Sequence, residues 1–444
     1  MTIEFGERLE TAGDPPDEPA CARATLPQLR NDLVIIEQTQ SDSVYYVIKD
    51  PVSLRYFRIV EDEFNLLRML DGKTSAESIA RSLQQSCHLK VEVSTVQRYI
   101  DKLSAAGFLT VPGDAAASSP IPPQATDNIK VAFFSKVLMI RIRTINPDAI
   151  FDRLINHLGL FFNRYFVGLA AASILAATII NVAKWGEITT QMRALFALHY
   201  VLGFWVAALL VAVLHECAHG LTCKRFGGEV REIGFLLVYF QPALYCNVSD
   251  AWLFKERSKR LWVMFGGGFF ESFIWALAVL VWSVTPPYTA ISQYCLIIIA
   301  ISGVKILFNF NPLIKLDGYY LLSDYLGVPN LRRKAFTFAR DWIKRNVFGR
   351  QVRMKPTSRR ERRIYVVFSL LALPYSIGLI LLLFWKLGVY LVSNYQSLGL
   401  LILITLLLVA FGDLIVAQML KLFRHPPGRS PQSGQASVTE AMDS

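Results

Sequence analysis

Two short motifs in this chain carry side chains that could bind a metal ion and act on water. The first is His215-Glu216-Cys217-Ala218-His219, in which two histidines are four residues apart. On an α-helix this spacing places both imidazoles on one face, one turn apart. Two imidazoles so placed are half of a typical zinc site, and the neighbouring glutamate can act on a metal-bound water. The spacing therefore predicts His215 and His219 as zinc ligands and Glu216 as the general base.

The second motif supplies a candidate for the third ligand. Asp317 lies in the stretch 311–318 (NPLIKLDG), after an apolar run that could return the chain to the depth of the histidines. A carboxylate is a usual zinc ligand, and a catalytic zinc site has three protein ligands and one position left for water. Asp317-Gly318 alone would indicate only a turn. Its pairing with the first motif makes Asp317 the predicted third ligand.

The composition indicates an integral membrane protein. Hydrophobic residues make up 53% of the 444 residues, and the mean hydropathy of +0.36 is high for a soluble protein. The net charge of +11 could point to nucleic acid. The basic residues, however, flank apolar runs, which is the pattern of membrane proteins. The first 30 residues are polar, so no secretory signal is expected, and the six cysteines are scattered without a C-x-x-C pair, so we expect reduced thiols.

Apolar runs of span length, about 20 residues each, dominate the second half of the chain. They cover residues 165–183, 194–217, 261–284, 290–310, 364–385 and 398–420. Basic side chains gather before the first apolar run, after the last one and in every second loop between the runs. If all six runs cross the membrane, these basic segments all lie on the same side of it. The positive-inside rule makes that side the cytoplasm. We therefore expect a multi-pass protein of the cell inner membrane, with both termini cytoplasmic and both motifs at cytoplasmic ends of spans.

Residues 30–112 are predicted to form a small α+β domain of the winged-helix type. Three β-rich runs precede three stretches of helical periodicity: 34–36, 44–48 and 56–60, then 64–70, 74–86 and 93–109. The predicted fold is thus mainly α, with this domain preceding a polytopic six-helix membrane domain at 165–420. The remaining segments are expected to be a disordered N-terminus, a flexible linker, an interfacial segment and a disordered cytoplasmic tail: 1–29, 113–129, 130–164 and 421–444.

The two motifs together resemble those of the site-2 protease family of intramembrane zinc metalloproteases. H-E-C-A-H and N-P-L-I-K-L-D-G each end an apolar run, and the resemblance covers residues 130–420. It implies that His215, His219 and Asp317 hold Zn²⁺ and that Glu216 is the general base. It also implies that Asn311 lies beside the site and helps to hold substrate or the developing oxyanion. The expected substrate is a peptide or a membrane protein within the lipid bilayer.

The N-terminal domain resembles the PqqD-like peptide-chaperone domain in the order of its elements and in the stretch 64–74 (FNLLRMLDGKT). In that family a leader peptide binds as an added strand beside the third helix, which requires an exposed sheet edge. The resemblance implies delivery of a peptide to the zinc site. It makes peptide-export or membrane-fusion proteins plausible partners.

Two other functions compete with a protease. One is a non-catalytic membrane subunit of a peptide maturation or export system that binds peptides without cutting them. The other is a winged-helix membrane regulator that binds DNA, which needs a strongly basic third helix. Here two basic residues of that helix region are balanced by two acidic ones: Arg98, Lys102, Glu92 and Asp101. No nucleic-acid partner is therefore expected.

Four further features have roles that the residues leave open. Glu271 lies inside an apolar run and either pairs with Lys305 or takes part in catalysis. The glycines at 266–268 more readily serve close helix packing than ligand binding. The β-rich stretch 227–242 either holds substrate or forms a hairpin that does not touch it. Cys217 is expected to be a small packing residue rather than a fourth ligand.

Overall fold

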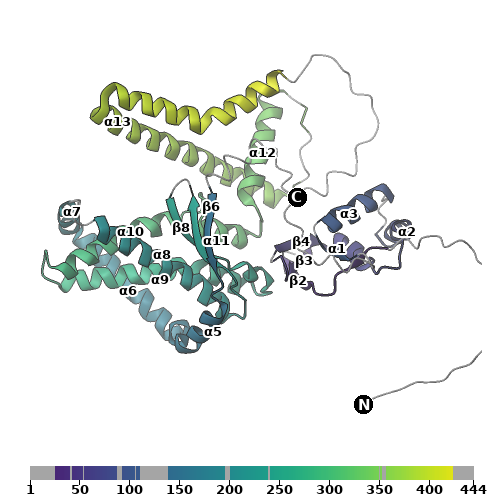
Figure 1. The fold of residues 1–444 in the computed structure, drawn as a ribbon, viewed down its shortest axis with the longest axis horizontal. Coiled ribbons are helices and arrows are strands. Elements are labelled where there is room, and N and C mark those ends of the chain that lie inside the picture. Colours follow the sequence, from purple (N-terminus) through teal and green to yellow (C-terminus); the bar gives the residue numbers. More distant parts are fainter. Residues whose placement is uncertain are drawn as a thin grey trace, which may run out of the picture. The chain divides into compact units, whose positions relative to one another are not determined.

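The computed structural model describes residues 26–40, 43–53, 55–87, 93–105, 107–110, 139–195, 201–238, 241–349, 351–352 and 357–423. The linker expected at 113–129 lies outside these residues, as do most of the N-terminus and tail that we expected to be disordered. The described chain is mainly helical (Figure 1). It divides into two compact units, the first with the elements from β1 to β5 and the second with those from β6 to α13.

The first unit combines small antiparallel sheets with three helices. Its elements are β1 (Gln28–Leu29), β2 (Val34–Gln40), β3 (Ser43–Asp50), β4 (Arg55–Val60), α1 (Glu61–Arg68), α2 (Ala76–Cys87), α3 (Val93–Ala105) and β5 (Leu109–Thr110). The main sheet has the order β2-β3-β4, and β1 pairs with β5. Helix α3 ends four residues before the predicted limit. Gly107, with φ of +80°, turns the chain there, and Leu109 enters β5.

Apolar side chains at helical spacing form the core of the first unit. Leu67, Ile79 and Val96 come from its three helices and are fully buried against one another and the sheet. The start of α2 is fixed by two polar side chains. Asp71 accepts hydrogen bonds from the backbone N–H groups of Lys73 and Thr74, each at 2.8 Å, and Ser75 Oγ accepts from Ser78 N–H at 3.3 Å.

The second unit is built around long apolar helices. They are α6 (Arg164–Ala183), α8 (Val201–Arg225), α9 (Arg257–Val284), α10 (Ala290–Asn309) and α13 (Arg359–Phe423). Among the described residues these five helices are long and apolar enough to cross a membrane, which is compatible with a multi-pass membrane protein. Helix α8 continues eight residues beyond the predicted run, because its polar last turns remain helical after the apolar stretch ends.

Helix α13 joins two of the six predicted runs, so the count of six spanning helices is not confirmed. The helix is broken at Gln396, whose φ of 49° and ψ of −123° are not helical, and its two arms fold back on each other (Figure 1). A Cβ at Gly399 would lie 2.0 Å from the carbonyl oxygen of Leu391. The turn therefore requires glycine at this position.

Shorter elements connect the long helices. They are β6 (Met139–Ile145), α5 (Asp148–His157), η1 (Gly159–Phe162), α7 (Trp185–Ala194), β7 (Ile233–Val238), β8 (Gln241–Cys246), η3 (Ser249–Leu253), α11 (Asp317–Leu326) and α12 (Leu331–Asn346). Strands β6, β7 and β8 form an antiparallel sheet in that order. Strand β6 and helix α5 arise from the segment 130–164, for which the alternating pattern predicted only an interfacial location. The β-rich stretch 227–242 forms β7 and the beginning of β8.

Helix α9 is the centre of the second unit, in contact with α6, α8, α10 and α11 (Figure 1). Its glycines allow this: a Cβ at Gly266 would lie 2.7 Å from Thr222 Oγ1 on α8, and one at Gly268 would lie 2.6 Å from the Phe310 ring. The predicted packing role of 266–268 is thus confirmed.

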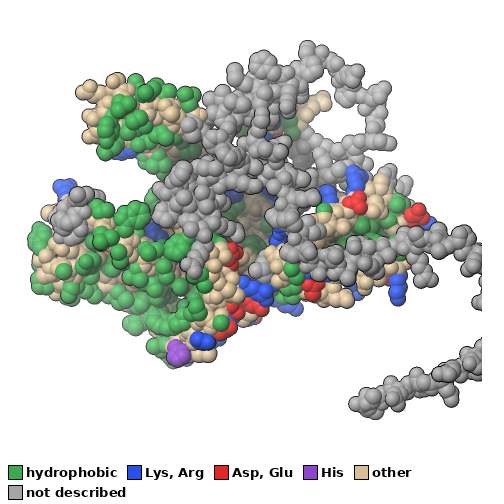
Figure 2. All heavy atoms as spheres, in the orientation of Figure 1, with side chains coloured by type: hydrophobic (Ala, Val, Ile, Leu, Met, Phe, Trp, Pro, Cys, Tyr) green, Lys and Arg blue, Asp and Glu red, His purple; other side chains and the backbone are tan. Residues whose placement is uncertain are grey.

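On the outside of the unit, hydrophobic side chains cover much of the visible surface (Figure 2). Leu202 and Trp205 of α8 are 74% and 61% exposed, as expected for helix faces that contact lipid.

Helices α11, α12 and α13 share a separate apolar cluster. Tyr319, Leu331 and Phe368, one from each helix, are buried in it. The backbone N–H of Arg332 donates to the hydroxyl of Tyr319 at 3.0 Å, and Ser369 Oγ donates to the carbonyl of Ala335 at 2.9 Å. This cluster fixes α11, whose first residue is Asp317.

Truncation of Leu67 to alanine should destabilise the first unit by about 2–5 kcal/mol, because it leaves a cavity among fully buried side chains. Hydrogen exchange followed by mass spectrometry should show faster exchange of the amides of α1, α2 and α3. Val52→Ala is the matched control, since Val52 is 57% exposed. Equal protection in the two variants would contradict this description of the core.

Candidate metal centre

Helix α8 presents His215 and His219 on one face, as their spacing predicted. Both are buried, with 4% and 6% of their surface exposed. His219 Nδ1 lies 2.7 Å from the carbonyl oxygen of Val263 on α9. A carbonyl oxygen can only accept a hydrogen bond, so Nδ1 carries the proton and Nε2 carries the free lone pair. His219 is therefore held with the nitrogen that binds a metal directed away from α9.

His215 is held by a different oxygen. Its Nδ1 lies 2.7 Å from Oε2 of Glu271, a fully buried carboxylate of α9. The same oxygen lies 3.3 Å from Nζ of Lys305 on α10. Of the two alternatives left open for Glu271, this contact supports the pairing with Lys305, and the contact with His215 was not predicted.

Asp317 reaches both histidines from the beginning of α11. Its Oδ2 lies 3.0 Å from His215 Nε2 and 3.4 Å from His219 Nε2. Gly318 makes this approach possible, since a Cβ there would lie 2.6 Å from the carbonyl group of Phe310. Burial alone would raise the pKa of Asp317, but the hydrogen bonds to the two imidazoles outweigh it and hold the pKa below its usual value. Asp317 is therefore ionised, which is the form that binds metals.

The three converging atoms have the spacing of zinc ligands. The two Nε2 atoms lie 3.2 Å apart, and the distances to the carboxylate are 3.0 and 3.4 Å. Ligands about 2.0–2.1 Å from a tetrahedral zinc ion are about 3.3 Å from one another. When both imidazoles are neutral and carry their proton on Nδ1, their Nε2 lone pairs and the carboxylate face one another and repel unless a proton or a metal cation lies between them. The group His215, His219 and Asp317 therefore fits a metal ion.

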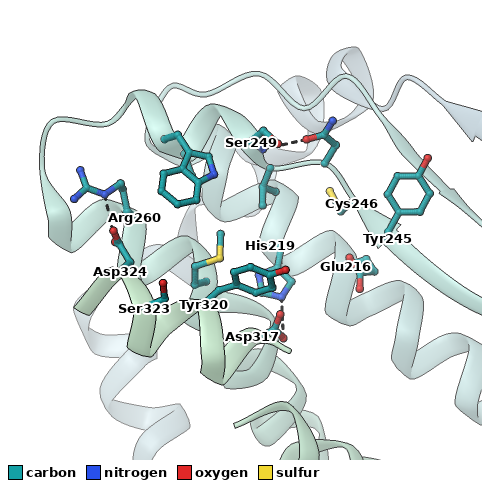
Figure 3. A pocket seen from close by; sticks show the side chains of 15 residues that line it. Glu216, His219, Tyr245, Cys246, Ser249, Arg260, Asp317, Tyr320, Ser323 and Asp324 are labelled. Carbon is teal, nitrogen blue, oxygen red and sulfur yellow. Dashed lines mark hydrogen bonds and ion pairs between the residues drawn. The ribbon is translucent and has the colours of Figure 1, made fainter. Parts of the chain in front are cut away.

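A cavity of about 450 Å³ opens beside these residues (Figure 3). Glu216 and Cys246 of β8 line it next to His219 and Asp317. The cavity is otherwise lined mainly by apolar and aromatic side chains, with a few neutral polar ones and an ion pair of Arg260 with Asp324 at 3.3 Å. The other lining residues are Tyr245, Asn247, Val248, Ser249, Ala251, Trp252, Met264, Tyr320 and Ser323.

Two residues considered in the sequence analysis, Asn311 and Cys217, are not among the converging ligands. Asn311 is not among the lining residues, and its Oδ1 accepts a hydrogen bond from the backbone N–H of Leu313 at 2.9 Å. This Asx turn begins the loop that leads to Asp317, so the role of Asn311 toward substrate stays a prediction. Cys217 packs in an apolar cluster with Phe151 and Val230, as expected for a packing residue.

Three contributions to the site were not predicted from the sequence. Tyr320 lines the cavity one turn after Asp317. Residues three apart on a helix share a face, so this spacing could have predicted that Tyr320 lies beside Asp317. The carbonyl of Val263 carries no signal in the sequence, because every residue has one. The contact of Glu271 with His215 depends on the register of α8 against α9, which periodicity alone does not determine.

Comparison with curated proteins finds similarity to one named "Putative peptide zinc metalloprotease protein YydH", from Bacillus subtilis (strain 168). The two are 26% identical over 122 residues, which cover 27% of this chain and 46% of the relative. The chain thus matches less than half of that relative's length. No protein-family model and no solved structure matches the chain. The relative's name suggests the peptide zinc metalloproteases, a class whose chemistry agrees with the donor set described above.

Gly267→Ala should displace His219 and weaken zinc binding by at least about tenfold, the scale on which misoriented ligands lose metal. The reason is steric: a Cβ at this position would lie 2.2 Å from His219 Nε2. Competition with a chromogenic chelator measures the affinity. Gly303→Ala is the control, because its Cβ would meet Trp275 at an ordinary 3.6 Å. Wild-type affinity in Gly267→Ala would show that His219 is not a ligand.

Proposed function

We propose that this chain is an intramembrane zinc metalloprotease that hydrolyses peptide bonds in a peptide or a membrane-associated precursor. The observation that carries the proposal is the convergence of His215, His219 and Asp317 within 4.8 Å, beside a glutamate and a cavity. The order of the motifs agrees with a site-2 protease-like enzyme. The name of the similar Bacillus subtilis protein also supports a peptidase.

In this proposal His215, His219 and Asp317 hold the zinc ion. When bound, zinc lowers the pKa of water to about 7 and polarises the carbonyl group of the scissile bond. Glu216 accepts a proton from the attacking water on its carboxylate and delivers it to the nitrogen of the leaving amine. Glu216 lines the cavity beside His219 and Asp317, where a substrate peptide would lie.

Tyr320 is the candidate donor to the developing oxyanion. Asn311, the residue expected for this task, is not among the residues that line the cavity, whereas Tyr320 lines it on the face of α11 that carries Asp317 (Figure 3). A phenolic O–H directed at the carbonyl oxygen stabilises negative charge that appears only in the transition state.

The cavity suits an extended, apolar substrate segment. A helix satisfies its own backbone hydrogen bonds, so a spanning substrate must unwind before it can be cut. Strand β8 is an edge of its sheet, and its residues Tyr245 and Cys246 line the cavity. An unwound segment could pair with that edge. In this way the stretch 227–242 and its sheet would hold substrate rather than form an uninvolved hairpin.

The location and partners are part of the same proposal. We place the chain in the inner membrane with six passes, two of them supplied by the arms of α13, and with both termini and the site on the cytoplasmic side. The first unit would act as a PqqD-like domain that delivers a peptide to the membrane unit. Peptide-export or membrane-fusion proteins are the partners that such a task implies.

Glu216→Gln should reduce cleavage by about 10²–10⁴-fold, because the amide cannot accept the proton of the attacking water. Zinc content should not change, since Glu216 is not among the three ligands. The measurement is cleavage of captured precursor peptides by purified protein, read by mass spectrometry. Glu187→Gln, a substitution on the exposed surface of α7, is the control.

Equal cleavage by wild type and Glu216→Gln would refute this mechanism. If both variants bind peptide and neither cuts it, the chain is a non-catalytic subunit of a peptide maturation or export system. Salt-dependent binding of DNA by the first unit would instead favour a membrane regulator.

Tyr320→Phe should lower kcat by about 10²–10³-fold, the effect of removing one oxyanion donor. Both KM and zinc affinity should stay at wild-type values, because the ring and its packing remain. Tyr325→Phe is the matched control: Tyr325 lies on the same helix, is 61% exposed and does not line the cavity. Unchanged kcat in Tyr320→Phe would remove Tyr320 from the mechanism.

A further inference from the structure

Glu271 is a carboxylate buried in the middle of an apolar helix, and nothing in the mechanism above uses it. None of its surface is exposed. Burial of a carboxylate in such surroundings is costly unless another charge compensates it. Its Oε2 lies within ion-pair distance of two groups from two other helices, His215 Nδ1 on α8 and Lys305 Nζ on α10. Three helices therefore meet at one oxygen atom.

The two histidines are held in parallel ways. In each imidazole Nδ1 faces an oxygen of α9, the carbonyl of Val263 for His219 and the carboxylate of Glu271 for His215. In each, Nε2 faces Asp317. An acceptor at Nδ1 fixes the tautomer and the orientation of a metal-binding imidazole, and a carboxylate also increases the basicity of the other nitrogen. His215 receives the stronger of the two acceptors.

Lys305 explains how a carboxylate can occupy this position. Its ammonium group, with the side chain 31% exposed, supplies the opposite charge at 3.3 Å. Within the part of the chain that the structure describes, neither oxygen of Glu271 makes a hydrogen bond of regular geometry. The contact with Lys305 at 3.3 Å is thus an ion pair, whereas the contact with His215 Nδ1 at 2.7 Å is a close polar contact of a ring that is charged only when protonated.

We propose that Glu271 is a positioning residue of the metal centre, which orients His215 through Nδ1, and that Lys305 holds the carboxylate in place. This inference rests on the proposed function, because it takes His215 as a zinc ligand. It assigns to Glu271 an effect on metal affinity rather than contact with substrate.

The test measures zinc affinity of the full-length protein in detergent by chelator competition, together with the d–d spectrum of the Co²⁺-substituted form. Glu271→Gln should weaken zinc binding by about 10–100-fold and shift the Co²⁺ bands. The double variant Glu271→Gln/Lys305→Met removes both charges, leaves no ammonium group without its partner, and should show the same loss. Asp148→Asn removes a carboxylate that pairs with Lys224 at 2.9 Å, away from the cavity and the three ligands, and is expected to keep wild-type zinc affinity.

Wild-type zinc affinity in either folded Glu271 variant would overturn the inference. A role in packing alone predicts a lower melting temperature of the zinc-free protein with no change in affinity or in the Co²⁺ spectrum, and that result overturns it too. The two proposals can fail separately. A wild-type chain that binds zinc but cuts no peptide contradicts only the peptidase, whereas one that binds no zinc contradicts both.

Discussion

The mutual repulsion of three electron-pair donors inside an apolar helix unit is the constraint that organises this molecule. Two imidazole nitrogens and a carboxylate oxygen face one another at 3.0–3.4 Å. Oxygen atoms occupy the opposite side of each imidazole, so a neutral ring that keeps its proton there leaves the repulsion in place, and an added proton or a cation is needed to relieve it. A cation at the centre converts this arrangement from unfavourable to strongly favourable. Binding of a metal ion by these residues would therefore be coupled to the folding of this region.

Several features of the second unit serve that convergence. Gly267 lets the His219 ring lie against α9, and Gly318 lets the beginning of α11 approach the end of α10. The apolar cluster of α11, α12 and α13 then fixes the helix that carries Asp317. The cavity, with Glu216 and Tyr320 on its wall, lies where these helices and β8 meet. The geometry thus joins a charged centre to an apolar space large enough for a peptide segment.

Much of this site could be predicted because its signals are local. The spacing of His215 and His219 determines a shared helix face, and apolar periodicity located the long helices and the elements of the first unit. Contacts between helices could not be predicted in the same way. The position of Asn311 depends on a turn in which its side chain bonds to Leu313, and the reach of Glu271 depends on how α8 and α9 pack. The break of α13 at Gln396 falls between the predicted runs 364–385 and 398–420, although glutamine itself carries no turn signal.

X-ray absorption at the zinc edge, on the purified full-length protein, tests the central claim most directly. The predicted spectrum has a shell of nitrogen and oxygen ligands at about 2.0–2.1 Å, with the multiple scattering of two imidazoles and no sulfur. Such a spectrum would identify the ligand set of two histidines and one carboxylate. A sulfur shell at about 2.3 Å would show that cysteine binds the metal, which contradicts the predicted ligands. Purified protein without zinc would contradict the metal centre itself.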